Sequence, residues 1–94
     1  MKPAQRRIWQ EALYYATREQ FNRQAGSPGY VDPRNEKRLR AALAVVGEHK
    51  AECMADHYCR PIALHSLTQS LAMRGMLGEL DEIMGYGEQQ KLPV

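Results

Sequence analysis

The segment from Pro61 to Gly85 constrains the fold most strongly, because its periodicity predicts a helix that is apolar along two sides. On one side, spacings of three and four residues select Ile62, His65, Gln69, Met73, Met76, Leu80 and Ile83. On the opposite side they select Leu64, Leu67, Leu71, Gly75 and Gly78. A helix with one solvent-exposed side needs a single apolar stripe. The second stripe therefore predicts a second packing partner, either elsewhere in this chain or in another copy of it.

Prolines mark where helices begin. A proline fits the first turn because its missing N–H would have no intrahelical partner there. The prolines that suit this role are Pro3, Pro33 and Pro61. Just before Pro33, the Asp32 carboxylate can accept hydrogen bonds from first-turn amides. These signals predict three helices, at about residues 3–25, 33–58 and 61–84.

The fold class that follows is all-α, a small three-helix bundle of the helical-hairpin type. A break near Gly75 would divide the last helix and give four. With 94 residues, the chain fits one helical domain, which we predict over residues 1–87 with a flexible tail at 88–94. So short a domain has a modest core that oligomerisation often supplements. We therefore expect a homodimer.

The first stripe is the predicted dimer or partner interface. Its seam residues are Gln69, Met73, Met76, Leu80 and Ile83. Methionine side chains adapt to more than one partner, and a lone polar residue such as Gln69 can set the register of a helical seam. The same stripe also fits an intrachain core that faces the first helix, and the sequence leaves both assignments open.

Two aromatic residues of the first helix, Tyr14 and Phe21, fall nearly opposite its expected buried stripe. One interpretation is partial burial under a loop, since single exposed aromatics are common. The other is an anchor for a second protein, because aromatic side chains concentrate binding energy at interfaces. We include both residues in the predicted partner surface.

Charge is distributed unevenly along the chain. Residues 1–40 hold nine Lys and Arg against four Asp and Glu, whereas residues 41–94 hold four against seven. The basic half supports an alternative function in nucleic-acid binding. The residues that would serve it best are Arg34, Lys37, Arg38 and Arg40. Interspersed glutamates dilute this field, so solvated faces and pairing with acidic side chains also explain the charges.

His49, Cys53 and His57 stand four residues apart, on one side of the second predicted helix. Imidazole and thiolate groups are zinc ligands, and an i, i+4 pair can chelate an ion. The three residues together span about 12 Å of helix axis, so one ion cannot reach all of them. We expect a polar patch in a helix interface instead, and predict no metal and no cofactor.

The function predicted from the sequence is that of a small, non-enzymatic regulator or adaptor in the cytoplasm. It would bind a larger cytosolic protein through an apolar helical surface, and it would also bind itself. The basic start of the chain is not followed by an uninterrupted apolar block, so we expect neither a signal peptide nor a membrane association. We find no glycine-rich phosphate loop or catalytic carboxylate pair in the sequence.

Overall fold

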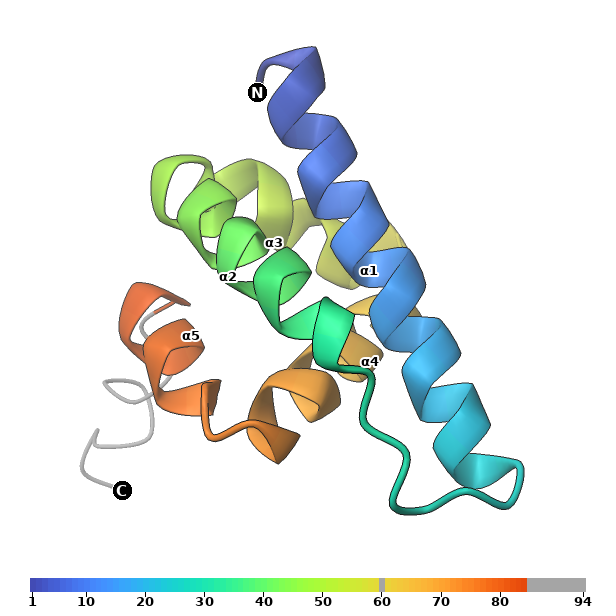
Figure 1. The fold of residues 1–94 in the computed structure, drawn as a ribbon. Coiled ribbons are helices and arrows are strands. Elements are labelled where there is room, and N and C mark those ends of the chain that lie inside the picture. The colour runs from blue at the N-terminus through green and yellow to red at the C-terminus, as the bar shows by residue number, and fades with distance from the viewer. Residues whose placement is uncertain (60, 85–94) are drawn as a thin grey trace, which may run out of the picture.

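The protein is all-α throughout the part of the chain that the computed structural model describes, residues 1–59 and 61–84 (Figure 1). Side chains are described except for those of residues 56–59 and 82–84. The helices are α1 (Pro3–Gln24), α2 (Pro33–Glu48), α3 (Lys50–Cys59), α4 (Pro61–Met73) and α5 (Leu77–Met84). The all-α prediction is confirmed. The predicted tail at 88–94 and the predicted domain end at residue 87 lie outside the described residues.

The predicted helix starts follow from local chemistry. Pro33 occupies the first turn of α2, and the Asp32 side chain accepts a hydrogen bond from the Arg34 amide at 2.9 Å. Pro3 likewise occupies the first turn of α1, where no side-chain cap is present. At the other end of α1, Gly26 has a φ of 122°, a conformation that favours glycine and takes the chain out of the helix.

The predicted single helix at 33–58 is wrong, because α2 ends at Glu48 and α3 begins at Lys50. His49, between them, has φ −129° and ψ 47°, which is not helical. The last turn of α2 contains two β-branched valines and a glycine, all weak helix formers, before Glu48. After the turn, α3 packs against α4 and buries Cys53 completely.

The break near Gly75 that the sequence allowed for is present. Gly75 has a φ of 69°. Its N–H donates to the Ala72 carbonyl at 3.1 Å, and the Met76 N–H donates to the Leu71 carbonyl at 2.9 Å. This is the Schellman arrangement, with a left-handed glycine and a buried apolar pair, Met76 and Leu71, at the positions where such ends make their hydrophobic contact.

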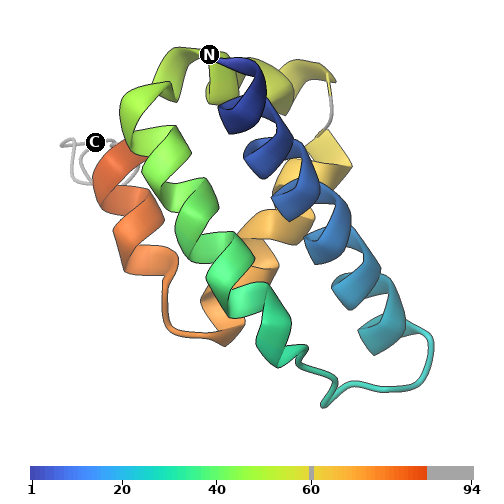
Figure 2. The same ribbon diagram turned by 45° about the horizontal axis from the view of Figure 1, so that its top comes forward.

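The helices surround one core. In both ribbon views α1 lies on one side of α2 and α5 on the other, and α1 packs against both α2 and α4 (Figures 1 and 2). The larger apolar residues of this core are Trp9, Leu13, Leu39, Leu43, Val45, Val46, Leu64, Leu67, Leu71, Met76 and Leu80. Within the described ranges, no helix combines the length and apolar character needed to cross a bilayer.

Part of the first stripe, the predicted interface, is therefore covered inside the chain. The turn at Gly75 lets α5 pack against α2, and this places Met76 and Leu80 in the core at 2% exposure each. Ile62, at the start of the same stripe, is 72% exposed. One end of the predicted stripe is thus exposed to solvent, whereas the other is buried in the core.

Candidate functional site

A groove of about 400 Å³ runs between α1 and α4. Its lining residues are Thr17, Gln20, Phe21 and Gln24 from α1 and Ile62, His65, Ser66 and Gln69 from α4. Phe21 is 62% exposed and Ile62 is 72% exposed, so each helix contributes one large accessible apolar side chain. None of these lining residues is an Asp, Glu, Lys or Arg.

Helical periodicity places these residues together. The α1 residues lie three, four and seven positions apart, and the α4 residues follow the same spacing, so each set occupies one face of its helix. The Gln20 amide links the two walls, because it donates to Ser70 Oγ at 3.0 Å and to Met73 Sδ at 3.2 Å. The two helices that form the groove are therefore joined by hydrogen bonds.

Tyr14 lies two turns before Phe21 on α1 and is 57% exposed. Its ring meets the Tyr15 ring edge-on at 5.2 Å, and the Arg18 guanidinium lies 5.8 Å from its centroid. Tyr14 does not line the groove. Because seven residues nearly complete two helical turns, Tyr14 and Phe21 project from the same side of α1, and neither is buried under a loop.

The residues of the predicted seam do not form one exposed stripe. Gln69 is exposed on the groove wall, and Met73, four residues further along α4, is half-buried. Met76 and Leu80 lie in the core because the helix ends after Met73 and the chain turns. They reach it through the packing of α5 against α2, whereas the intrachain assignment had the stripe face the first helix. The side chain of Ile83 lies outside the described residues. Of the seam, Gln69 and Met73 remain near the surface, and the predicted homodimer has no continuous apolar seam among the described side chains.

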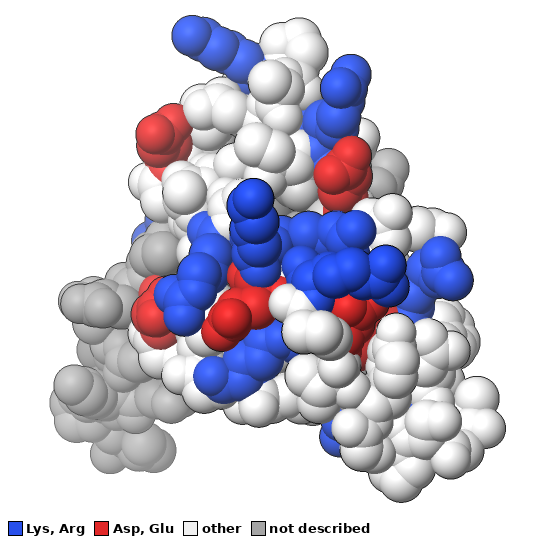
Figure 3. All heavy atoms as spheres, viewed as in Figure 1, with Lys and Arg blue, Asp and Glu red and all other residues white. Residues whose placement is uncertain are grey.

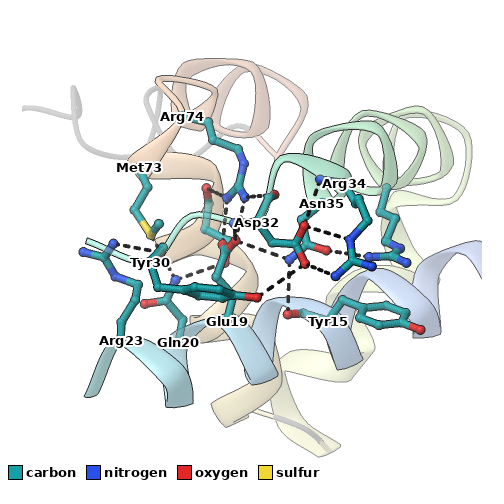
Figure 4. Close-up of polar contacts among 12 residues, drawn as sticks. Tyr15, Glu19, Gln20, Arg23, Tyr30, Asp32, Arg34, Asn35, Met73 and Arg74 are labelled. Carbon is teal, nitrogen blue, oxygen red and sulfur yellow. Dashed lines mark hydrogen bonds and ion pairs between the residues drawn. The ribbon is translucent and has the colours of Figure 1, made fainter. Parts of the chain in front are cut away.

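A polar network lies beneath the loop that joins α1 to α2 (Figure 4). Arg74 donates from Nη1 to Glu19 Oε1 at 2.7 Å and from Nη2 to Glu19 Oε2 at 2.6 Å. The backbone N–H of Asp32 and the side-chain amide of Asn35 also donate to Glu19 Oε2, at 2.9 and 3.3 Å. Asp32 in turn accepts two hydrogen bonds from the Arg34 guanidinium, at 3.1 and 3.0 Å. Helix α1, the loop and the end of α4 are thus joined.

The network holds α1, the loop and the end of α4 together. Burial alone would raise the pKa of Glu19, but its hydrogen bonds, first those from Arg74, outweigh burial and hold the pKa below its ordinary value. The Arg34 side chain, with its amide, lowers the pKa of Asp32 to about 2. Among the described residues, every buried side-chain nitrogen and oxygen has a hydrogen-bond partner. The buried part of the network is therefore fully hydrogen-bonded, and it joins α1, the loop and the end of α4.

The predicted nucleic-acid residues lie on α2, where Lys and Arg side chains gather across the face shown in Figure 3. Arg40 pairs with Glu36 at 3.7 Å, and Arg34 pairs with Asp32. The Arg38 guanidinium stacks on the Tyr15 ring at 3.6 Å, whereas Lys37 is exposed. Two of the four cations are therefore matched by carboxylates of their own chain.

The break in the helix falls at His49, the first of the candidate metal residues. His49 lies between α2 and α3 and contacts Gln5 Oε1 through Nε2 at 2.9 Å, whereas Cys53 is fully buried on α3. The side chain of His57 lies outside the described residues. In the part of the chain that the structure covers, no three His, Cys, Asp or Glu side chains are grouped as they would be around a metal ion.

Sequence reasoning missed the groove between α1 and α4 and the pairing of Glu19 with Arg74. The sequence signals for the groove were Phe21 on α1 and the start of the first stripe, of which Ile62, His65 and Gln69 line the groove. Comparison with protein-family models, with curated proteins and with solved structures finds no match for this chain.

Proposed function

We propose that this chain is a small, non-enzymatic regulator or adaptor that binds a larger protein through the groove between α1 and α4. The observation that carries the proposal is the exposure of Phe21 and Ile62 on facing walls of a groove with little charge. Soluble proteins seldom expose paired large apolar side chains along a concavity unless that surface binds something. A partner helix with apolar residues three and four positions apart would fit between two helical walls.

The energetics favour these two side chains as anchors. Covering a large apolar side chain fully is worth about 1.5–3 kcal/mol. The neutral polar residues around them, such as Gln24 and Gln69, can hydrogen-bond a partner without the desolvation cost of an ionised group. This division between an apolar centre and a polar rim is typical of protein interfaces.

Site-specific photo-crosslinking tests the proposal. We would place a benzophenone amino acid at Ile62 and, in a matched control, at the exposed Ala51, which is likewise the second residue of its helix. We expect one protein to be crosslinked from position 62 and not from position 51, and to bind the purified chain directly. Adducts with nucleic acid, or equal adducts from both positions, would contradict the proposal.

Nucleic-acid binding is the second candidate, and the clustering of cations on α2 favours it. Its weakness is that Asp32 and Glu36 already engage Arg34 and Arg40. If this function were correct, retention on immobilised DNA or RNA would fall steeply with ionic strength, because bound cations displace counterions from the phosphates. Neutralising Lys37 and Arg38 would then lower retention further.

A further inference from the structure

A second groove runs along the other helix that packs against α1. Its first part, of about 390 Å³, is lined by Ile8, Glu11, Arg34, Lys37, Arg38 and Ala41. Its second part, of about 240 Å³, is lined by Gln5, Ile8, Ala41, Ala44, Val45 and Glu48. Ile8 and Ala41 line both parts, so the two hollows adjoin along the seam between α1 and α2.

This groove has an apolar middle and a basic end. Ile8 is 37% exposed, and small alanines on α2 leave room beside it. Three cations, Arg34, Lys37 and Arg38, line one end together with the carboxylate of Glu11, and Asp32 pairs with Arg34 from outside the groove. At the opposite end, Glu48 supplies a negative charge. The groove between α1 and α4 has no such charge gradient, so the two surfaces differ in chemistry.

Two of the three cations are already held in place. Arg38 stacks on Tyr15 and donates to the Asn35 side chain at 2.7 Å. Arg34 donates two hydrogen bonds to Asp32 while its side chain stays 77% exposed. A guanidinium has five N–H donors, so both arginines keep donors for an incoming carboxylate. Because these side chains are fixed beforehand, less conformational entropy is lost when they bind a ligand.

We propose that the groove between α1 and α2 binds an acidic amphipathic helix of a partner protein. Apolar residues of that helix would cover Ile8 and Ala41, and its carboxylates would meet Arg34, Lys37 and Arg38. From Arg34 to Glu48 the α2 axis rises about 21 Å, the length of a helical segment of roughly 14 residues. A neutral or basic residue suits the end of the segment that lies next to Glu48.

An acidic helix fits this groove better than a nucleic acid does. A phosphate backbone carries uniform negative charge and gains affinity from several cations along its path. Here the path runs from three cations, past Glu11, over an apolar floor and towards Glu48. Such alternation opposes a polyanion, whereas a peptide helix can place one or two carboxylates at the basic end and methyl groups beyond them.

This inference does not depend on the groove between α1 and α4. Helix α1 forms a wall of both grooves, with α4 in one and α2 in the other. If both surfaces bind, the chain holds two partners of different chemistry on either side of one helix. That arrangement is what an adaptor requires.

Selection from a phage-displayed library of 14-residue peptides with helix-forming framework positions tests the inference. We expect selected peptides to combine two or three Asp or Glu near one end with apolar residues at spacings of three and four. Anisotropy of a labelled synthetic copy of the best peptide then gives its affinity. Selected peptides without acidic residues, or displacement of the peptide by an equal concentration of a 15-base-pair DNA duplex, would overturn the inference.

Matched variants locate the binding site. Lys37→Glu should weaken peptide binding about tenfold, because it reverses one cation of the basic end. Lys50→Glu changes net charge identically on an exposed α3 residue outside the groove, and should leave affinity within about twofold. Ile62→Glu should also leave it unchanged, which separates this surface from the groove between α1 and α4. Equal losses from Lys37→Glu and Lys50→Glu would overturn the assignment, and a thermal melt of each variant verifies folding.

Discussion

Arg74 and Glu19 form a doubly hydrogen-bonded ion pair that ties the end of α4 to α1, with their side chains 6% and 0% exposed. Arg74 also donates to the carbonyl of Asp32 at 2.9 Å, and Glu19 accepts from the Asp32 N–H. The pair therefore fixes the spacing of α1 and α4 and the loop that leads into α2. Because the groove between α1 and α4 lies between these two helices, its shape rests on this contact.

Removing one partner of this pair should be costly. Arg74→Met leaves a buried carboxylate without its counterion, and we expect a loss of about 3–5 kcal/mol in the free energy of unfolding. Adding Glu19→Gln, which keeps an acceptor for the Asp32 N–H without the charge, should recover much of the loss. Chemical denaturation of the single and double variants measures this coupling. A loss below about 1 kcal/mol in Arg74→Met would show that the pair does not hold the fold together.

The turn at Gly75 offers a second test. Its φ of 69° is unfavourable for residues with a Cβ, so Gly75→Ala should lower stability by about 1–2 kcal/mol. Gly78→Ala is the matched control, because Gly78 lies in α5 with open space around its Cα and should gain about 0.5 kcal/mol. Equal effects of the two substitutions on the denaturation midpoint would mean that the chain does not turn at Gly75.

The two environments of the predicted stripe can be separated by truncation. Leu80→Ala should cost about 2–5 kcal/mol, because it removes buried methyl groups from the core. Ile62→Ala should stay within about 0.5 kcal/mol of the parent, since Ile62 is 72% exposed. Thermal unfolding of both variants provides the comparison. A small effect for Leu80→Ala together with a large one for Ile62→Ala would reverse the assignment of core and surface.

Acid should destabilise the fold through Asp32 and Glu19, whose pKa values are both lowered in the folded chain. A lowered carboxyl pKa contributes stability above the pKa of the unfolded chain, near 4, and that stability is lost as the pH falls towards about 2. Asp32→Asn keeps a side chain that can cap α2 but cannot titrate. Denaturation between pH 5 and pH 2 should therefore give a shallower decline for this variant, and an unchanged decline would contradict the assignment.

Local signals were enough to predict most helix boundaries. Pro3, Asp32 with Pro33, and Pro61 open helices where expected, and Gly75 produces the break that its freedom at positive φ allows. The break at His49 was missed because no proline marks it. Weak helix formers precede it, but the burial of Cys53 and the packing of α3 on α4 are tertiary effects that a periodic pattern does not encode.

The candidate surfaces were harder to predict than the helices. Tyr14 and Phe21 are 57% and 62% exposed, so neither is buried under a loop, and their role as anchors for a second protein stays a prediction. The predicted seam does not form a continuous surface, because its periodicity requires one unbroken helix and α4 ends at Met73. Glu19 and Arg74 lie 55 positions apart, so nothing local could indicate their contact.

The most direct test measures how tightly the partner protein, identified by crosslinking from position 62, binds two matched variants of this chain. Titration calorimetry gives both affinities. Ile62→Glu and Ala51→Glu each place a carboxylate in the first turn of a helix, where the helix dipole favours it, so both should fold. We predict that Ile62→Glu weakens binding tenfold or more, by about 1.4 kcal/mol at least, and that Ala51→Glu leaves it within about twofold. Equal affinities for the two variants would contradict the assignment of the groove between α1 and α4 as the protein-binding surface.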